Sequence, residues 1–145
     1  MDSADTLIGQ LSLQAHPEGG WYRETHRAEA DANGRARWTA IIFLLKADES
    51  SHWHRVDADE LWVWQGGDPL ALQISERDEG PARTILLGAD VLAGQSLQGL
   101  VPPRAWQAAH PMAGAFGYSL VSCVVTPGFE FAGFELAEPD WAPGA

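Results

Sequence analysis

From about residue 21 onward, apolar residues stand in short runs rich in β-branched and aromatic side chains, and Gly or Pro stands in nearly every gap between the runs. Runs of this kind, bounded by turn residues, predict β-strands. The expected strands span residues 21–25, 38–45, 52–56, 60–65, 70–75, 83–87, 96–101, 106–109 and 118–126. The run at 38–45 is apolar at nearly every position, which is typical of a strand that is buried on both faces.

A helical pattern occurs near the start of the chain. Apolar positions spaced i, i+1 and i+4 within residues 5–14 predict a short amphipathic helix with Ser3 or Asp5 as its N-cap, ending before the turn residues 17–20. The many short strands, with turn residues at roughly ten-residue spacing, predict an all-β sandwich or barrel. Long helices do not alternate with the strands, so parallel α/β folds are disfavoured.

Composition and size narrow the class of protein further. The chain has 145 residues, of which 46% are hydrophobic and 20% are charged. These values are typical of one soluble globular domain, expected here over residues 1–145, with a core large enough to need no disulfide. Cys123 is the single cysteine, so no disulfide can form within the chain, which fits a reducing compartment. The first residues lack the apolar segment of a signal peptide, so we expect a cytoplasmic protein.

The charge balance is strongly acidic. Twenty Asp and Glu stand against nine Lys and Arg, for a net charge of −11. Nucleic acids and anionic membrane surfaces bind basic patches, and no such patch is visible. The longest apolar run, at residues 40–45, is far too short to span a membrane. We therefore expect a small-molecule ligand, with no nucleic-acid or membrane partner.

The densest group of chemically active side chains lies within residues 51–62. On a strand, His52 and His54 point to the same face, and a turn at 57–59 returns Glu60 beside them. Two imidazoles and one carboxylate can hold a divalent metal and leave positions open for substrate. Without a metal, the same groups can serve as base and acid. Four further residues are expected to have structural roles: His16, His26, His110 and Cys123.

The spacing of His52, His54, Glu60 and Gly67 resembles the first motif of the cupin superfamily. Several stretches, including a Pro-Glu-Gly-Gly and a Pro-Gly-Phe segment, are similar to a small single-domain branch of that superfamily, cupin family 5. The similar stretches are residues 16–25, 39–45, 54–55, 59–62, 67–70, 101–102, 106–109, 125–129 and 134–136. The resemblance implies a double-stranded β-helix jelly roll, usually dimeric, with a ligand pocket inside the barrel and no settled activity. We expect a homodimer here as well, because the edge strands of a jelly roll need protection.

Two departures from the superfamily pattern leave the cofactor open. Five residues separate His54 from Glu60, where the pattern has three or four, so Asp59 is an alternative carboxylate. The second cupin motif, expected at residues 103–107, ordinarily supplies a further histidine, whereas this chain has Gln107, a weak oxygen ligand. The cofactor is therefore expected to be either a divalent metal or none.

Aromatic side chains give a second indication of a binding site. The chain has seven tryptophans, of which Trp62 shares a strand face with Glu60, and Tyr22 likewise shares a face with Glu24. Aromatic faces stack on sugar rings and flat heterocycles, and an arginine fork binds carboxylate or phosphate. The residues expected to bind the ligand are Tyr22, Arg23, Glu24, Trp62 and Gln107.

Three functions are consistent with these residues. The resemblance implies a fold similar to that of the deoxysugar epimerases, which are metal-free cupins. An epimerase or isomerase here would act on a sugar-like or other small polar metabolite and would use His54 as its base. The carboxylates that can assist are Asp57, Asp59 and Glu60, and the candidate acids are Tyr118 and Tyr22. The second function is a metal-dependent dioxygenase or isomerase, with His52, His54 and Glu60 as metal ligands and Gln107 as a fourth. The third is a binding module without catalysis.

Overall fold

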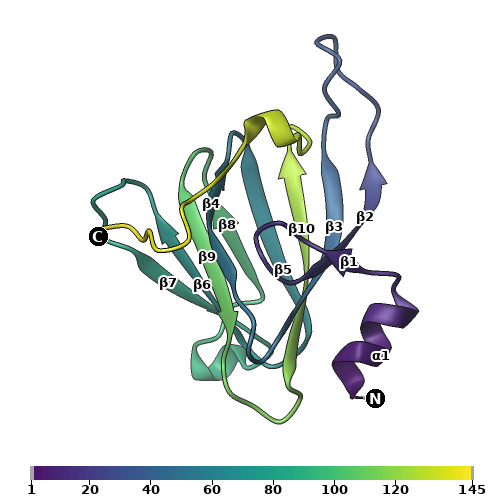
Figure 1. Cartoon of the computed structure of the whole chain (residues 1–145), viewed down its shortest axis with the longest axis vertical. Helices are drawn as coiled ribbons and strands as arrows, with labels where there is room; N and C mark the ends of the chain where they lie inside the picture. The colour runs from purple at the N-terminus through teal and green to yellow at the C-terminus, as the bar shows by residue number, and fades with distance from the viewer. Residues whose placement is uncertain (1, 145) are drawn as a thin grey trace.

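Residues 2–144, the part of the chain that the computed structural model describes, form two antiparallel sheets packed face to face (Figure 1). The first sheet has the order β1 (Gln14–Ala15), β2 (Trp21–Arg27), β3 (Thr39–Lys46), β10 (Tyr118–Thr126), β5 (Asp59–Gly67) and β8 (Gln98–Val101). The second has the order β11 (Phe134–Leu136), β4 (Ser51–Val56), β9 (Trp106–Pro111), β6 (Leu70–Ser75) and β7 (Arg83–Leu87). A helix, α1 (Ser3–Gln10), and two 3-10 turns, η1 (Val91–Ala93) and η2 (Phe131–Gly133), complete the chain. The predicted jelly-roll sandwich is confirmed.

The main core lies between the two sheets, and β3 is buried on both of its faces. Phe43 and Leu45 point into the main core, where they cluster with Trp62. Leu44 alternates to the other face and packs against Ala4 of α1. The helix therefore shields the outer face of the first sheet (Figure 1), which explains why the run at 38–45 is apolar almost throughout.

The helix begins and ends earlier than its sequence pattern predicts. Asp2, rather than Ser3 or Asp5, is the N-cap, and its Oδ1 atom accepts the backbone N–H of Asp5 at 2.8 Å. The helix ends at Gln10 because Ser12 adopts a φ of +56°, outside the right-handed helical region. No helix in the described part of the chain is long and apolar enough to cross a bilayer.

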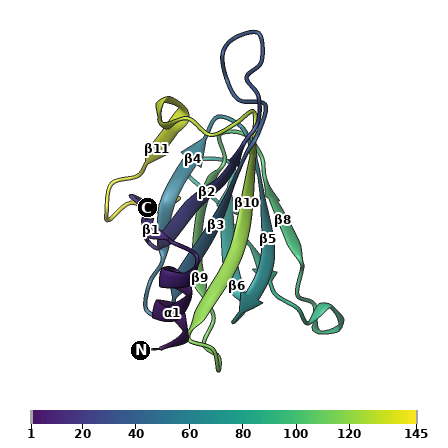
Figure 2. The same ribbon diagram turned by 90° about the vertical axis from the view of Figure 1, so that its right-hand side faces the viewer.

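Strands β6, β7 and β10 have the bounds that the sequence predicts. The short strands β1 and β11 are not predicted, because segments of two and three residues show no period. Figure 2 shows both on one side of the sandwich, β1 beside β2 and β11 beside β4. These two unpredicted strands flank the cavity described next.

Candidate functional site

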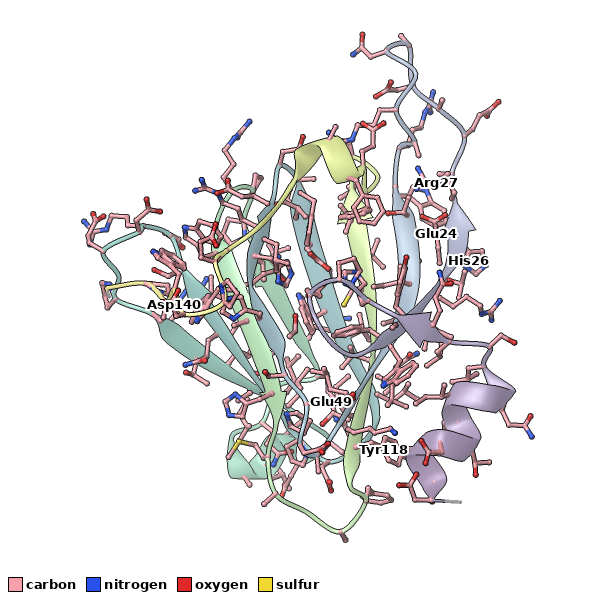
Figure 3. The ribbon with its side chains drawn as sticks, in the orientation of Figure 1. Glu24, His26, Arg27, Glu49, Tyr118 and Asp140 are labelled. Atoms are coloured by element: carbon pink, nitrogen blue, oxygen red, sulfur yellow. The ribbon has the colours of Figure 1, made fainter. Side chains whose placement is uncertain are left out.

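A cavity of ≈ 560 Å³ opens between the two sheets. Residues of β2, β3, β5 and β10 line it from the first sheet, and residues of β4 and β11 line it from the second. The segment 129–131, which belongs to neither sheet, completes the wall. Glu24 and Arg27 belong to its wall and lie near the projecting loop 28–38 (Figure 3), so they mark its open rim. A cavity of this size accommodates a small organic ligand.

Glu18 reaches the cavity from the turn between β1 and β2. Gly19 has a φ of +110°, and a Cβ atom there would collide with the carbonyl oxygen of Ser50. Because residue 19 is a glycine, the backbone of the turn can approach the start of β4 closely. There the N–H of His52 donates to the carbonyl oxygen of Glu18 at 2.8 Å. The Glu18 side chain then meets Ser51, whose hydroxyl donates to Glu18 Oε2.

The Glu18 carboxyl lies between two imidazoles. His16 Nε2 is 3.1 Å from Glu18 Oε1, and His54 Nε2 is 3.0 Å from Glu18 Oε2. All three side chains are at most 9% exposed. We call His16, Glu18 and His54 the acid–base cluster.

The hydrogen bonds of His16 determine which of its nitrogens carries the proton. His16 Nδ1 accepts the backbone N–H of Glu18 at 3.1 Å, so the ring hydrogen sits on Nε2 and is donated to Glu18 Oε1. A second proton on Nδ1 would face that amide hydrogen. Burial, together with the nearby His54, lowers the pKa of His16 to about 4. His16 is therefore a neutral donor at neutral pH.

His54 has the opposite tautomer. Its Nδ1 atom is 2.7 Å from the carbonyl oxygen of His52, and because a carbonyl only accepts, Nδ1 carries a hydrogen. In the neutral ring, Nε2 is then an acceptor that faces Glu18 Oε2. Burial raises the pKa of Glu18 to about 8 against the effect of the Ser51 hydroxyl, and burial lowers the pKa of His54. Near neutral pH, a protonated Glu18 therefore donates to a neutral His54, and the two share one proton.

Glu60 projects into the cavity from β5, and hydrogen bonds from buried residues fix the position of its carboxyl group. Trp62 Nε1 donates to Gln107 Oε1 at 2.8 Å, which turns the amide NH₂ of Gln107 toward Glu60 Oε1 at 3.1 Å. Burial raises the pKa of Glu60 to about 7 against the attraction of His54, and the Glu18 carboxyl also raises it. Two buried carboxyls whose pKa values are both raised toward neutral pH therefore face one cavity, which is typical of groups that exchange protons with a ligand.

Aromatic rings cover the acid–base cluster. The ring centroid of Phe134 lies 5.7 Å from that of His54, and the centroid of Tyr22 lies 4.5 Å from that of His16. Phe129 and Phe131 continue this wall, with centroids 4.9 Å apart. The apolar cover keeps water from the two carboxyls, which is the physical cause of their raised pKa values.

These shifts predict that the protein loses stability as the pH rises above 6.5. Glu18 and Glu60 have raised pKa values in the folded protein, so both stabilise the fold fully when the pH is below their ordinary pKa of 4.5. This stabilisation is lost as the pH rises through about 8 for Glu18 and about 7 for Glu60. His16 and His54 have lowered pKa values in the folded protein, so both stabilise the fold when the pH is above their ordinary pKa of 6.5. This stabilisation is lost as the pH falls. Above pH 6.5 the histidines add only the small stabilisation that remains as they finish deprotonating in the unfolded chain, so the loss from the two carboxyls dominates.

The free energy of unfolding is expected to fall by about 2 kcal/mol between pH 6.5 and pH 8, as urea denaturation at several pH values would measure. A double variant, Glu18→Gln with Glu60→Gln, removes both titrating carboxyls and serves as the control in which the decline is flattened. A free energy of unfolding that rises over this interval would contradict the assignment.

The structure brings some of the predicted site residues together and leaves others outside. Four line the cavity: Tyr22, Glu24, His54 and Glu60. Trp62 and Gln107 are at most 1% exposed and lie behind Glu60, while Arg23 alternates to the other face of β2. Tyr118 lies at the far end of the sandwich beside α1 (Figure 3), so Tyr22 is the candidate acid that borders the cavity.

His52 does not share a face with His54. Strand β4 carries a bulge between Ser51 and His54, where its register with β9 shifts. The bulge puts Ser51 and His54 on the side of the cluster, and His52 Nε2 instead lies 2.8 Å from the carbonyl oxygen of Glu138. The alternation expected from the sequence is wrong at this point, and His52 does not lie with His54 and Glu60.

The side chains around the cavity do not fit the metal site that the cupin motif implies. His16 has its one lone pair engaged by a backbone N–H, and His52 lies elsewhere, so His54 is the one imidazole of the three whose lone pair faces the cluster, where it accepts from Glu18. Within residues 2–144, no group of three or more His, Cys, Asp or Glu side chains is arranged to hold a metal ion. The arrangement provides acid–base groups rather than a set of metal ligands.

Reasoning from the sequence missed Glu18 as a site residue and gave His16 a structural role. The available signal was the Pro-Glu-Gly-Gly segment at 17–20, because two glycines after an acidic residue are typical of a turn that approaches another backbone closely. The sequence does not show which strand the turn meets, and this contact with β4 is what makes Glu18 part of the site.

Comparisons with known proteins agree with the fold. Residues 5–137 match the family model Cupin_5, described as Cupin superfamily (DUF985). A solved structure from Shewanella oneidensis is 40% identical, with a TM-score of 0.86 over 95% of this chain and 86% of that one. A hypothetical protein from Leishmania major is 37% identical, with a TM-score of 0.85 over 94% of this chain and 88% of that one.

A more distant structure shares the fold alone. Oxalate decarboxylase from Bacillus subtilis is 12% identical, with a TM-score of 0.61 over 87% of this chain and 30% of that one. None of the curated proteins matches the chain. The comparisons therefore support the architecture and leave the chemistry to be argued from the cavity.

Proposed function

This chain belongs to the Cupin_5 family of the cupin superfamily, and we propose that it binds a small polar carbonyl compound in its barrel and moves a proton on it, as an isomerase or epimerase. The observation that carries the proposal is the contact of Glu18 and His54, 3.0 Å apart around one shared proton, in a cavity that Glu60 also lines. Proton transfer next to a carbonyl needs a base that works near neutral pH and an acid that donates to the oxygen.

Glu60 is the proposed base. Its carboxylate, with a pKa of about 7, takes the proton from the carbon beside the substrate carbonyl. The electron pair of the broken C–H bond forms a C=C bond, and the carbonyl oxygen takes the proton that Glu18 and His54 share. The product is an enol, and the negative charge moves from Glu60 to the acid–base cluster, so the total charge of the cavity is unchanged. Return of the Glu60 proton to the neighbouring carbon, while anionic Glu18 takes the proton of a hydroxyl group on the first carbon, gives the isomer. For the epimer, Tyr22 donates a proton to the opposite face of the first carbon, Glu18 takes back the enol proton, and Glu60 passes its proton to Tyr22.

The neighbours of Glu18 support its change of charge. The Nε2 hydrogen of His16 and the hydroxyl of Ser51 both donate to its carboxyl oxygens, so an anionic Glu18 keeps two hydrogen bonds. Phe134 covers His54 and keeps water from the shared proton. Gln107 holds the Glu60 carboxylate in place through its amide NH₂.

The proposed function is tested by exchange of solvent deuterium into candidate substrates. The protein is incubated in D₂O with ketoses, aldoses, hydroxyketones and aminoketones, and deuterium at the carbon beside the carbonyl is followed by NMR. Exchange that is lost in His54→Gln and retained in His52→Gln supports the proposal, because the two variants change the same residue type inside and outside the cluster. Binding of a panel compound without exchange would contradict it and favour a binding module.

A further inference from the structure

Acidic side chains outnumber basic ones in the cavity wall. Four glutamates line it: Glu18, Glu24, Glu60 and Glu130. Arg27 is the one arginine or lysine in the wall formed by residues 2–144. An anionic ligand that leaves water needs a cation free to pair with it, so the state of Arg27 decides whether such a ligand fits.

Arg27 is already paired. Its Nη2 atom donates to Glu24 Oε1 at 2.7 Å, and its Nε atom donates to Glu24 Oε2 at 3.2 Å. Arg35, whose Nε atom lies 3.4 Å from Glu130 Oε1, is in turn held by Asp57 through two hydrogen bonds of 2.8 and 3.0 Å. Both guanidinium groups are already paired with carboxylates, so a sugar phosphate or nucleotide sugar would have to compete with Glu24 or Asp57 for them.

The wall between the rim and the acid–base cluster is aromatic. Phe129 is tied to the rim because its carbonyl oxygen accepts from Arg27 at 3.2 Å, and Phe134 covers His54. The planes of Phe129, Phe131 and Phe134 stand at 81°, 68° and 82° to one another, so their faces look in different directions along one stretch of wall. Phe131 is 57% exposed, so its ring does not simply fill the core. Ring faces carry partial negative charge and attract organic ammonium groups.

We propose that the ligand of this cavity is a small organic cation, an amine whose ammonium group lies against the phenylalanine rings and the rim glutamates Glu24 and Glu130. The inference rests on the proposed function, because it names the substrate class for the same cavity, a compound with both an amine and a carbonyl group. A neutral ligand would leave the ring faces without a cationic partner, and an anion would meet a wall in which carboxyl groups outnumber guanidinium groups.

Three probes of nearly the same shape test the charge preference. Choline is the cation, 3,3-dimethylbutan-1-ol is its neutral isostere, and 3,3-dimethylbutanoate is the anion. Each is titrated into the full chain, and the backbone amide signals of the cavity wall are followed by NMR. Choline is expected to bind about tenfold more tightly than the alcohol, and the carboxylate is expected not to bind. No binding of choline, or binding of the alcohol or carboxylate at least as tightly, would overturn the proposal.

Two variants at the rim should shift this preference in opposite directions. The Arg27–Glu24 pair is 46% and 36% exposed, so either member can be replaced with little effect on folding. Arg27→Gln frees Glu24 and should tighten choline binding about threefold, whereas Glu24→Gln frees Arg27, weakens choline binding and admits the carboxylate. Arg77→Gln removes the same charge from an exposed pair with Glu79 and should change nothing.

Failure of this inference can be told apart from failure of the proposed function. If deuterium exchange into a neutral panel compound depends on His54 but choline does not bind, the proton transfer stands and the ligand class is wrong. If choline binds with the stated preference but aminoketones show no exchange, the ligand class stands and the catalytic proposal fails.

Discussion

Replacing Glu18 with glutamine is expected to lower the rate of deuterium exchange into the substrate by about 100- to 10,000-fold. The amide has the shape of the protonated carboxyl but cannot release a proton to the carbonyl oxygen. His54 then still accepts a hydrogen bond, yet no transferable proton lies between the two residues. The measurement is the D₂O exchange assay, with the compound of the panel that the parent protein exchanges fastest.

The matched control for this loss is Glu49→Gln. Glu49 accepts the indole N–H of Trp21 and lies outside the cavity wall (Figure 3), so its replacement makes the same Glu-to-Gln change away from the cavity. The control should retain the exchange rate of the parent. If Glu18→Gln also retained it, Glu18 would not supply the proton, and the proposed mechanism would have to be abandoned.

Replacing Glu18 with alanine is expected to lower the free energy of unfolding by about 3 kcal/mol, whereas glutamine lowers it by less than about 1 kcal/mol. Alanine leaves the Nε2 hydrogen of His16, the Nε2 lone pair of His54 and the hydroxyl of Ser51 without partners in a buried site. Glutamine restores all three bonds, since its carbonyl oxygen accepts from His16 and its NH₂ group donates to both other residues.

This difference separates a neutral acid from a buried ion pair. If Glu18 were a carboxylate paired with a positively charged His54, glutamine would leave that charge buried without a counter-ion and would destabilise by about 3 kcal/mol or more. Urea denaturation of the two variants at pH 7 makes the comparison. Equal losses for alanine and glutamine would contradict the neutral state of Glu18.

Much of the fold follows from patterns that are local in the sequence. The alternation of Val121, Cys123 and Val125 with polar or less buried neighbours defines β10 and its inward face, and strand β6 begins after the turn ending at Pro69. Such patterns have a period of two and need no knowledge of the neighbouring strands. The sandwich architecture is predictable for this reason.

The candidate site depends instead on contacts between segments far apart in the chain. His54 and Glu60 were predictable as cavity residues because they stand in the dense group of imidazoles and carboxylates at residues 51–62, whose spacing resembles the cupin motif. The position of Glu18 in the cavity was not predictable from the sequence, because it depends on the close approach of Gly19 to the backbone of Ser50. The orientation of His52 away from the cluster was not predictable either. It results from a bulge in the pairing of β4 with β9, and the sequence pattern of β4 does not indicate this bulge.

The central claim is that Glu18 and His54 share one proton as a neutral acid and a neutral imidazole. Nitrogen NMR of the histidine-labelled protein at pH 7 tests it most directly, with His16→Gln and His54→Gln variants to assign the signals. The account predicts a hydrogen on Nδ1 alone for His54, with Nε2 as an acceptor, and a hydrogen on Nε2 alone for His16. A His54 ring that carries hydrogens on both nitrogens at pH 7 would contradict it, because Glu18 would then be a carboxylate.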